Sequence, residues 1–292
     1  MSTNIGVKTV KNIFTKLAAT AATGAVLSVG IAIEAPKAQA ISLSITNAGF
    51  ETPVLGDDQF TDQLGIANPP GITDFLPGWD IYDPNGILAS FTGREPTTGD
   101  YPSVGVWNPP AGNYPGEAPE GKNVAYVYLP TYSPNLVTVG SGVTGISQTL
   151  SSSLAAKTLY TLKVDVGNTT GINPSFPLVR EIYKGFPGYE VQLLAGGNIL
   201  ATESALNPAE GTFTTSVLSF LATADNPYLG TPLQIRLINK NAAAGGDVDF
   251  DNVKLEATAV PEPASVLGLA AFGALGATLK RKKKLAAQKA EA

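Results

Sequence analysis

The residues that could carry chemistry in this chain are defined first by two absences. The 292-residue sequence contains no histidine and no cysteine. Ser-His and Cys-His catalysis, imidazole-bound zinc, and thiolate or disulfide chemistry are therefore excluded. The side chains that remain favour carboxylate chemistry or Ca²⁺ bound through oxygen ligands.

An alternating acidic run, Asp247-Val-Asp249-Phe-Asp251, lies near the end of the domain. The interleaved Val248 and Phe250 predict a strand whose three acids project from one face. Such a face either raises the local affinity for cations or serves solubility. The run is not an EF-hand loop, because Asn252 and Thr258 stand where that motif needs Gly and Glu.

Aromatic side chains gather in a loop-rich segment and offer a second kind of chemistry. Trp107, Tyr114 and Tyr101 could stack on the apolar faces of sugar rings. Tyr side chains also anchor Gly- and Pro-rich loops, so a structural role stays open for them. Trp79 is expected in the core.

Short β-like runs separated by Gly, Pro, Asn and Ser clusters must position these residues. Alternation of apolar and polar residues, or β-type composition, predicts strands at 160–166, 189–193, 233–237, 248–250, 123–129 and 213–221. Residues 57–119 are predicted to form extended loops across one end or face. The pattern favours one all-β domain, an antiparallel sandwich spanning residues 41–259.

The charge of this domain differs from that of the whole chain. Residues 41–260 hold nine Lys and Arg against 21 Asp and Glu, a net charge of −12, whereas the whole chain has −5. An acidic domain is repelled by phosphate backbones, so we expect no nucleic-acid partner.

The N-terminus predicts an export signal over residues 1–40. Lys8, Lys11 and Lys16 precede an apolar stretch at 17–33, and Ala38-Gln-Ala40 fits the small-x-small cleavage pattern. A signal helix, export machinery and signal peptidase are expected, with Ala38 and Ala40 marking the cleavage site.

The C-terminus carries an apolar span followed by a basic stop. Residues 264–279 would reach about 24 Å as a helix, somewhat less than the ~30 Å hydrocarbon core. Cations resist crossing, so the domain before the span should face outward. The stop consists of Lys280, Arg281, Lys282, Lys283 and Lys284.

Together with Pro261-Glu262-Pro263, this tail resembles the PEP-CTERM sorting signal of exported bacterial proteins. The resemblance implies a sorting signal at 260–284 with its motif at 260–263, a transmembrane helix at 264–279, and a cytoplasmic tail at 285–292. It also implies recognition of the motif by an exosortase-type protease and transfer from a transient membrane anchor to the cell surface or extracellular matrix. The alternative is an ordinary C-terminal anchor.

A succession of short motifs spans residues 45–256. It includes Asn47-Ala-Gly-Phe-Glu51, Leu76-Pro-Gly-Trp79, Ile146-Ser-Gln-Thr-Leu150 and Phe250-Asp-Asn-Val253. This order resembles the galactose-binding-like jelly rolls of the DUF642 type and related carbohydrate-binding modules. The resemblance implies that the first and last strands meet, with Glu51 and Asp251 holding a structural Ca²⁺. Alternatively, both acids are solvated, or backbone N–H groups at strand ends satisfy them.

The leading expectation for function is a non-catalytic, exported surface protein that binds carbohydrate or exopolysaccharide. A purely structural or adhesive surface protein is the alternative, and a carboxylate-dependent glycoside hydrolase or lyase is a third hypothesis. No acid pair carries a catalytic motif, so the sequence does not predict an enzyme.

Overall fold

The computed structural model describes residues 39–66, 68–89, 101–129, 142–170, 185–242 and 246–260. The chain divides into two compact units, Met1–Lys37 and Ala38–Ala292, and every described residue belongs to the second. No helix within these described ranges is long and apolar enough to cross a membrane. The expected signal helix and the expected span at 264–279 lie outside the described residues.

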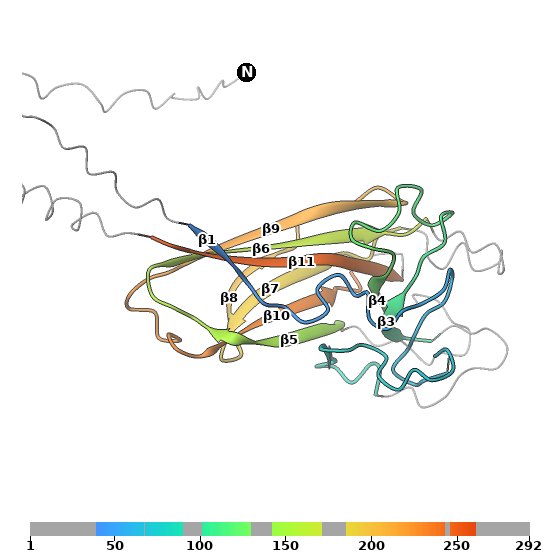
Figure 1. Ribbon diagram of the computed structural model, residues 1–292, viewed down its shortest axis with the longest axis horizontal. Coiled ribbons are helices and arrows are strands. Elements are labelled where there is room, and N and C mark those ends of the chain that lie inside the picture. Colours follow the sequence, from blue (N-terminus) through green and yellow to red (C-terminus); the bar gives the residue numbers. More distant parts are fainter. Residues whose placement is uncertain are drawn as a thin grey trace, which may run out of the picture. The chain divides into compact units, whose positions relative to one another are not determined.

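One sheet, sheet A, has six strands. The order is β3-β4-β11-β6-β9, and β1 pairs with β11 beside this path. All of its pairings are antiparallel (Figure 1). Its strands are β1 (Ala40–Leu43), β3 (Ser103–Trp107), β4 (Val124–Tyr128), β6 (Thr158–Asn168), β9 (Thr212–Ala222) and β11 (Asp247–Ala259).

Sheet B is antiparallel and has five strands in the order β2-β5-β10-β7-β8. Its strands are β2 (Asp80–Tyr82), β5 (Thr144–Ser153), β7 (Tyr189–Ala195), β8 (Asn198–Glu203) and β10 (Pro232–Asn239).

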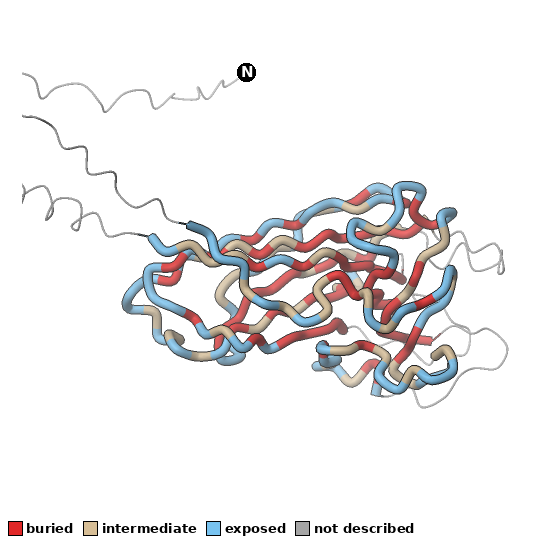
Figure 2. The backbone as a smooth tube through the Cα atoms, viewed as in Figure 1, coloured by how far each residue is buried: buried red, intermediate tan, exposed pale blue. Residues whose placement is uncertain are grey.

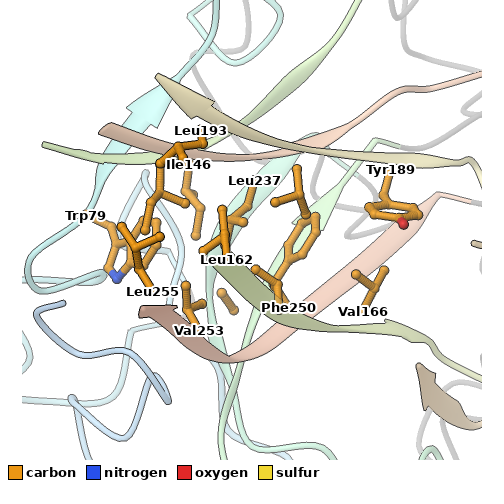
Figure 3. Packing of buried hydrophobic residues seen from close by; sticks show 14 of the residues in the cluster. Trp79, Ile146, Leu162, Val166, Tyr189, Leu193, Leu237, Phe250, Val253 and Leu255 are labelled. Carbon is orange, nitrogen blue, oxygen red and sulfur yellow. The ribbon is translucent and has the colours of Figure 1, made fainter. Parts of the chain in front are cut away.

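The core lies between the two sheets, because alternate residues of each strand point inward. Val164, Val166 and Leu255 of sheet A join Val191 and Leu237 of sheet B in one buried cluster. Figure 3 shows side chains from both sheets meeting in this cluster, with Phe250 of β11 pointing toward β10. The expected all-β class is confirmed, with two antiparallel sheets that share one core.

Trp79 closes the core beside β2. Its ring is 6% exposed, and the ring centroids of Trp79 and Phe50 lie 5.4 Å apart. The indole Nε1–H donates to the carbonyl oxygen of Thr46 at 3.1 Å. A buried tryptophan needs such a partner, and the predicted core position of Trp79 is confirmed.

All six runs predicted to be strands are strands. They fall within or overlap β4, β6, β7, β9, β10 and β11. The pattern had not marked β1, β2, β3, β5 or β8 as strands. Residues 57–119 contain β2 and β3 and otherwise connect elements irregularly over their described part.

Strand β11 organises sheet A through contacts with three other strands. Its first part pairs with β4, its later part with β1, and most of its length with β6. The register with β6 shifts between Asp251 and Lys254, and Asn252 adopts a positive φ of 52° in this bulge. Bulges re-aim side chains locally.

The outer face of sheet A is covered at the β3–β4 end by the segment around Thr61. The Tyr126 hydroxyl of β4 donates to the Thr61 carbonyl at 2.8 Å, and Gly105 is the β3 partner of Tyr126. A Cβ on Gly105 would overlap this carbonyl. Glycine at 105 therefore allows the covering segment to lie directly on the sheet.

Replacing Gly105 with alanine should push the Thr61 carbonyl away and weaken its hydrogen bond to Tyr126. We expect the free energy of unfolding to fall by about 1–3 kcal/mol, the usual cost of overpacking a buried contact. Chemical denaturation of Gly105→Ala measures this. Gly116→Ala is the matched control, because nothing lies within 4 Å of its Cβ position. Equal stability of the two variants would contradict the close approach.

Candidate functional site

The acidic face of β11 is buried. Asp247 is 5% exposed, whereas Asp249 and Asp251 are 0% exposed. Figure 2 shows β11 as mostly buried along its first half. The sequence prediction that three acids share a strand is confirmed, but solubility cannot be their role, since water does not reach them.

Sheet register explains what surrounds Asp249. Asp249 of β11 pairs with Tyr126 on β4 on one side and with Gly167 on β6 on the other. Tyr114, from the segment after β3, donates its hydroxyl hydrogen to Asp249 Oδ2. A Cβ on Gly167 would lie 2.7 Å from the Tyr114 hydroxyl oxygen and 2.5 Å from the Phe213 ring.

Two aromatic rings pack against each other beside Asp249. The rings of Tyr114 and Phe213 have centroids 4.3 Å apart. Phe213 is the β9 partner of Gly167, and the missing side chain there makes room for both rings. Such ring faces carry negative charge density and attract cations.

Two carboxyl oxygens in this cluster are buried without a hydrogen-bond partner. They are Asp247 Oδ1 and Asp249 Oδ1, and the finding covers the described part of the chain. Leaving a buried polar group without a hydrogen bond costs about 1–3 kcal/mol of folding free energy. Each of these two oxygens is therefore expected to carry a proton or to contact a bound ligand. Asn113 Oδ1 and Asn168 Oδ1 are unsatisfied in the same way.

Desolvation governs the protonation of this pair. Burial raises the pKa of Asp247 to about 7. Burial and then the neighbouring charge of Asp247 raise the pKa of Asp249 well above its usual range. A carboxyl group that stays protonated near neutral pH can act as a general acid.

Asp247 and Asp249 are not among the candidate site residues named from the sequence, although its alternation places them on one face. Tyr126, Gly167 and Phe213, which lie beside Asp249, are not among those candidates either. An acidic alternation flanked by strongly apolar residues was the available signal. Whether such a face is solvated or covered depends on Tyr114 and on strands distant in sequence.

The three aromatic residues predicted to stack on sugars lie on this same side of sheet A. Tyr114 contacts Asp249, and Tyr101 donates to Asp62 Oδ2 at 3.0 Å. Both are buried, at 2% and 6% exposure, so neither ring is open to solvent. Trp107 ends β3, is half-buried, and forms an isolated bridge with Phe60.

Glu51 and Asp251 are brought to one loop. Glu51 Oε1 accepts hydrogen bonds from the backbone N–H groups of Lys122 and Asn123, both at 2.8 Å. Asp251 Oδ2 accepts the Glu120 N–H at 2.8 Å. These contacts agree with the alternative in which backbone N–H groups donate hydrogen bonds to both acids.

The fit of this loop to a metal ion is limited. Burial raises the pKa of Asp251 to about 8, so either a proton or a cation would neutralise it. Within the described ranges, no group of three or more His, Cys, Asp or Glu side chains is arranged to hold a metal. A cation here would need Glu51, Asp251 and backbone carbonyl oxygens.

The expected processing residues lie mostly beyond the described ranges. Ala40 begins β1, whereas Ala38 is not among the described residues. The remainder are likewise outside the described part: Pro261, Glu262, Pro263, Lys280, Arg281, Lys282, Lys283 and Lys284.

Comparison with known proteins identifies the domain. A family model described as HpiC1 cyclase, HpiC1-like, matches residues 41–256. The chain belongs to the HpiC1-like cyclase family. A second model, the PEP-CTERM protein-sorting motif, matches residues 259–283. A search of curated proteins found no significant match.

Solved structures of cyclases from Fischerella support this membership. The Stig cyclase Fisc from Fischerella sp. TAU, in complex with (3Z)-3-(1-methyl-2-pyrrolidinylidene)-3H-indole, is 41% identical, with a TM-score of 0.60. The match covers 76% of this chain and 100% of that chain. A Fischerella sp. TAU cyclase in complex with 4-(1H-indol-3-yl)butan-2-one is 40% identical over the same shares, with a TM-score of 0.60. An apo cyclase from Fischerella sp. is 38% identical, covering 76% and 98%, with a TM-score of 0.61.

This membership corrects the expected function. The expectations of a non-catalytic carbohydrate- or exopolysaccharide-binding module and of no enzyme were wrong, because the relatives of this HpiC1-like chain are cyclases. The DUF642-type assignment gives way to the HpiC1-like family. The all-β class and the PEP-CTERM motif are confirmed, and the motif implies exosortase-type processing of an exported protein.

The raised pKa values make stability depend on pH. Asp in an unfolded chain titrates near 3.9, so between that pH and about 7 the folded protein holds more protons at Asp247. The contribution of Asp247 to the free energy of unfolding is therefore fully present below about pH 4. It is lost as the pH rises through 7, by at most about 1.4 kcal/mol per pH unit. Denaturation between pH 5 and 9 should give a shallower profile in Asp247→Asn.

Asp225→Asn is the control for this profile, because Asp225 is exposed and its pKa is lowered by hydrogen bonds from Thr223 and the backbone. Its profile between pH 5 and 9 should match that of the unmodified protein. A wild-type stability that rises over this range would contradict the burial of protonated carboxyl groups.

Proposed function

We propose that this chain catalyses ring closure of an indole-bearing substrate, with Asp249 as the proton donor. The observation that carries the proposal is a buried carboxyl whose Oδ1 has no protein partner in the described ranges. Membership in a cyclase family, and indole compounds bound to two related cyclases, support the substrate class.

The contacts of Asp249 suggest which oxygen carries the proton. Oδ2 accepts the Tyr114 hydroxyl hydrogen, so Oδ1 is the oxygen left to bear and donate a proton. Transfer to an unsaturated carbon of the substrate would create a carbocation, and a new carbon–carbon bond would form as the ring π electrons attack it. Loss of a ring proton back to Asp249 would restore the acid, so the reaction is an isomerisation.

Neighbouring groups would assist this cycle. Tyr114 would stabilise the Asp249 carboxylate that forms after transfer, since a hydrogen bond to an ionised acceptor is stronger. The ring faces of Tyr114 and Phe213 would lie near the cation. Asp247 disfavours a second negative charge and so keeps Asp249 protonated beforehand.

Asp249→Asn should abolish most of the activity, because the amide preserves shape but cannot donate a carboxyl proton. General acid catalysis typically contributes 10²–10⁴-fold, and we expect a loss of about that size in kcat. The assay incubates the protein with indoles bearing an unsaturated side chain and separates ring-closed isomers of unchanged mass. Reaction in D₂O should place deuterium in the product.

Binding separates this role from a folding defect. Asp249→Asn should still bind 4-(1H-indol-3-yl)butan-2-one, measured by calorimetry, and Asp225→Asn should keep full activity. Wild-type turnover by Asp249→Asn would reject the proposed acid. Failure of every indole tested with the unmodified protein would reject the substrate class.

We also propose a structural Ca²⁺ at Glu51 and Asp251, supported by two acids held at one loop and by the burial of Asp251. EDTA should lower the melting temperature, Ca²⁺ should restore it, and Glu51→Gln or Asp251→Asn should remove the difference. An EDTA-insensitive melt would show that backbone N–H groups and a proton suffice.

We further propose that residues 1–40 are removed by signal peptidase and that the domain at 41–259 is exported. Residues 264–279 would anchor it transiently, with the basic residues 280–284 and the tail 285–292 on the cytoplasmic side. Cleavage near Pro261-Glu262-Pro263 by an exosortase-type protease would then deliver the cyclase to the cell surface or matrix. The PEP-CTERM match supports this route.

A further inference from the structure

The start of β1 and the end of β11 lie side by side. Ala40 of β1 pairs with Thr258 of β11, which also pairs with Leu159 near the start of β6. The backbone N–H of Val260 donates to the Lys157 carbonyl at 2.7 Å. Both expected processing points therefore adjoin one end of the sandwich, at the left of Figure 1, which we term the processing end.

The acidic site lies at the other end of β11. Asp247 is the first residue of this strand and Ala259 the last. Asp249 is ten residues from Ala259, which corresponds to roughly 33 Å of extended strand. The loops around β3 and β4 lie at that far end in Figure 1.

The processing end exposes apolar side chains. Ile41 is 65% exposed, Leu221 48%, Val260 41% and Leu159 36%. Leu159 and Leu221 are direct cross-strand partners on the outer face of sheet A. The next outward pair toward the site is Thr161 and Ser219, which are polar.

Chain length brings this end to the membrane whenever the tail is inserted. Only residues 260–263 separate β11 from the apolar run that begins at Ala264. Four residues reach at most about 14 Å. The headgroup layer of each leaflet is about 5–8 Å thick, so β11 must end within about 6–9 Å of its outer surface.

We propose that, while its tail anchors the chain, the processing end rests on the outer surface of the bilayer. Ile41, Leu159, Leu221 and Val260 contact the headgroup–acyl boundary, where exposed apolar side chains lose contact with water. The buried Asp249 site then lies at the end of the domain that faces away from the membrane. This inference rests on insertion of residues 264–279 and not on the cyclase activity.

The absence of cysteine makes the test direct, because a single introduced thiol can be labelled. Full-length Leu159→Cys, Leu221→Cys, Val217→Cys and Ala111→Cys variants would be reconstituted in phosphatidylcholine–phosphatidylglycerol vesicles and labelled with a fluorescent maleimide. Val217 is 52% exposed and lies four residues before Leu221 on β9. Ala111 is exposed in the segment after β3.

Lipids with a nitroxide headgroup should quench the labels at 159 and 221 at least about twofold more than the label at 111, with 217 between them. Weak quenching at all four sites, equal quenching at 111 and 221, or failure of the full chain to float with vesicles would each overturn the inference. Protection of 159 by self-association without lipid quenching would assign the surface to a second copy and would also overturn it.

Discussion

Desolvation of neighbouring carboxyl groups on β11 is the constraint on which the site depends. Two acids excluded from water on adjacent outward positions of a strand resist ionisation, since solvent does not stabilise their charge and each repels the charge of the other. The protein meets this cost with protonation and with a hydrogen bond from Tyr114. The same burial that costs stability creates an acid able to work near neutral pH.

Two glycines make this burial possible. Gly105 admits the Thr61 carbonyl onto the sheet, and Gly167 admits the rings of Tyr114 and Phe213. A side chain at Gly167 would displace Tyr114 from its contact with Asp249 and open the acidic residues to water. Water would lower their pKa values toward those of ordinary carboxyl groups. The raised pKa of Asp249 therefore depends on the close packing that glycine allows.

Strand β11 also separates the acidic site from the sorting motif. Its first residues hold the acidic site, whereas its last residues pair with β1 and lead into the sorting motif. The acidic site and the sorting motif adjoin opposite ends of a single 13-residue strand, which pairs with β6 on both sides of its bulge.

The sequence by itself determined the all-β class, six of the strands, the core position of Trp79 and the sorting tail. These follow from local alternation and from linear motifs, which need no distant partner. It also placed Asp247, Asp249 and Asp251 on one face. Only the tertiary structure decided that this face is buried, because residues distant in sequence cover it, and Tyr114 lies 135 positions from Asp249. Burial favours the protonated form of a carboxyl group, and sequence-based reasoning that treated these acids as solvated therefore expected a binding module, whereas the chain belongs to a family of cyclases.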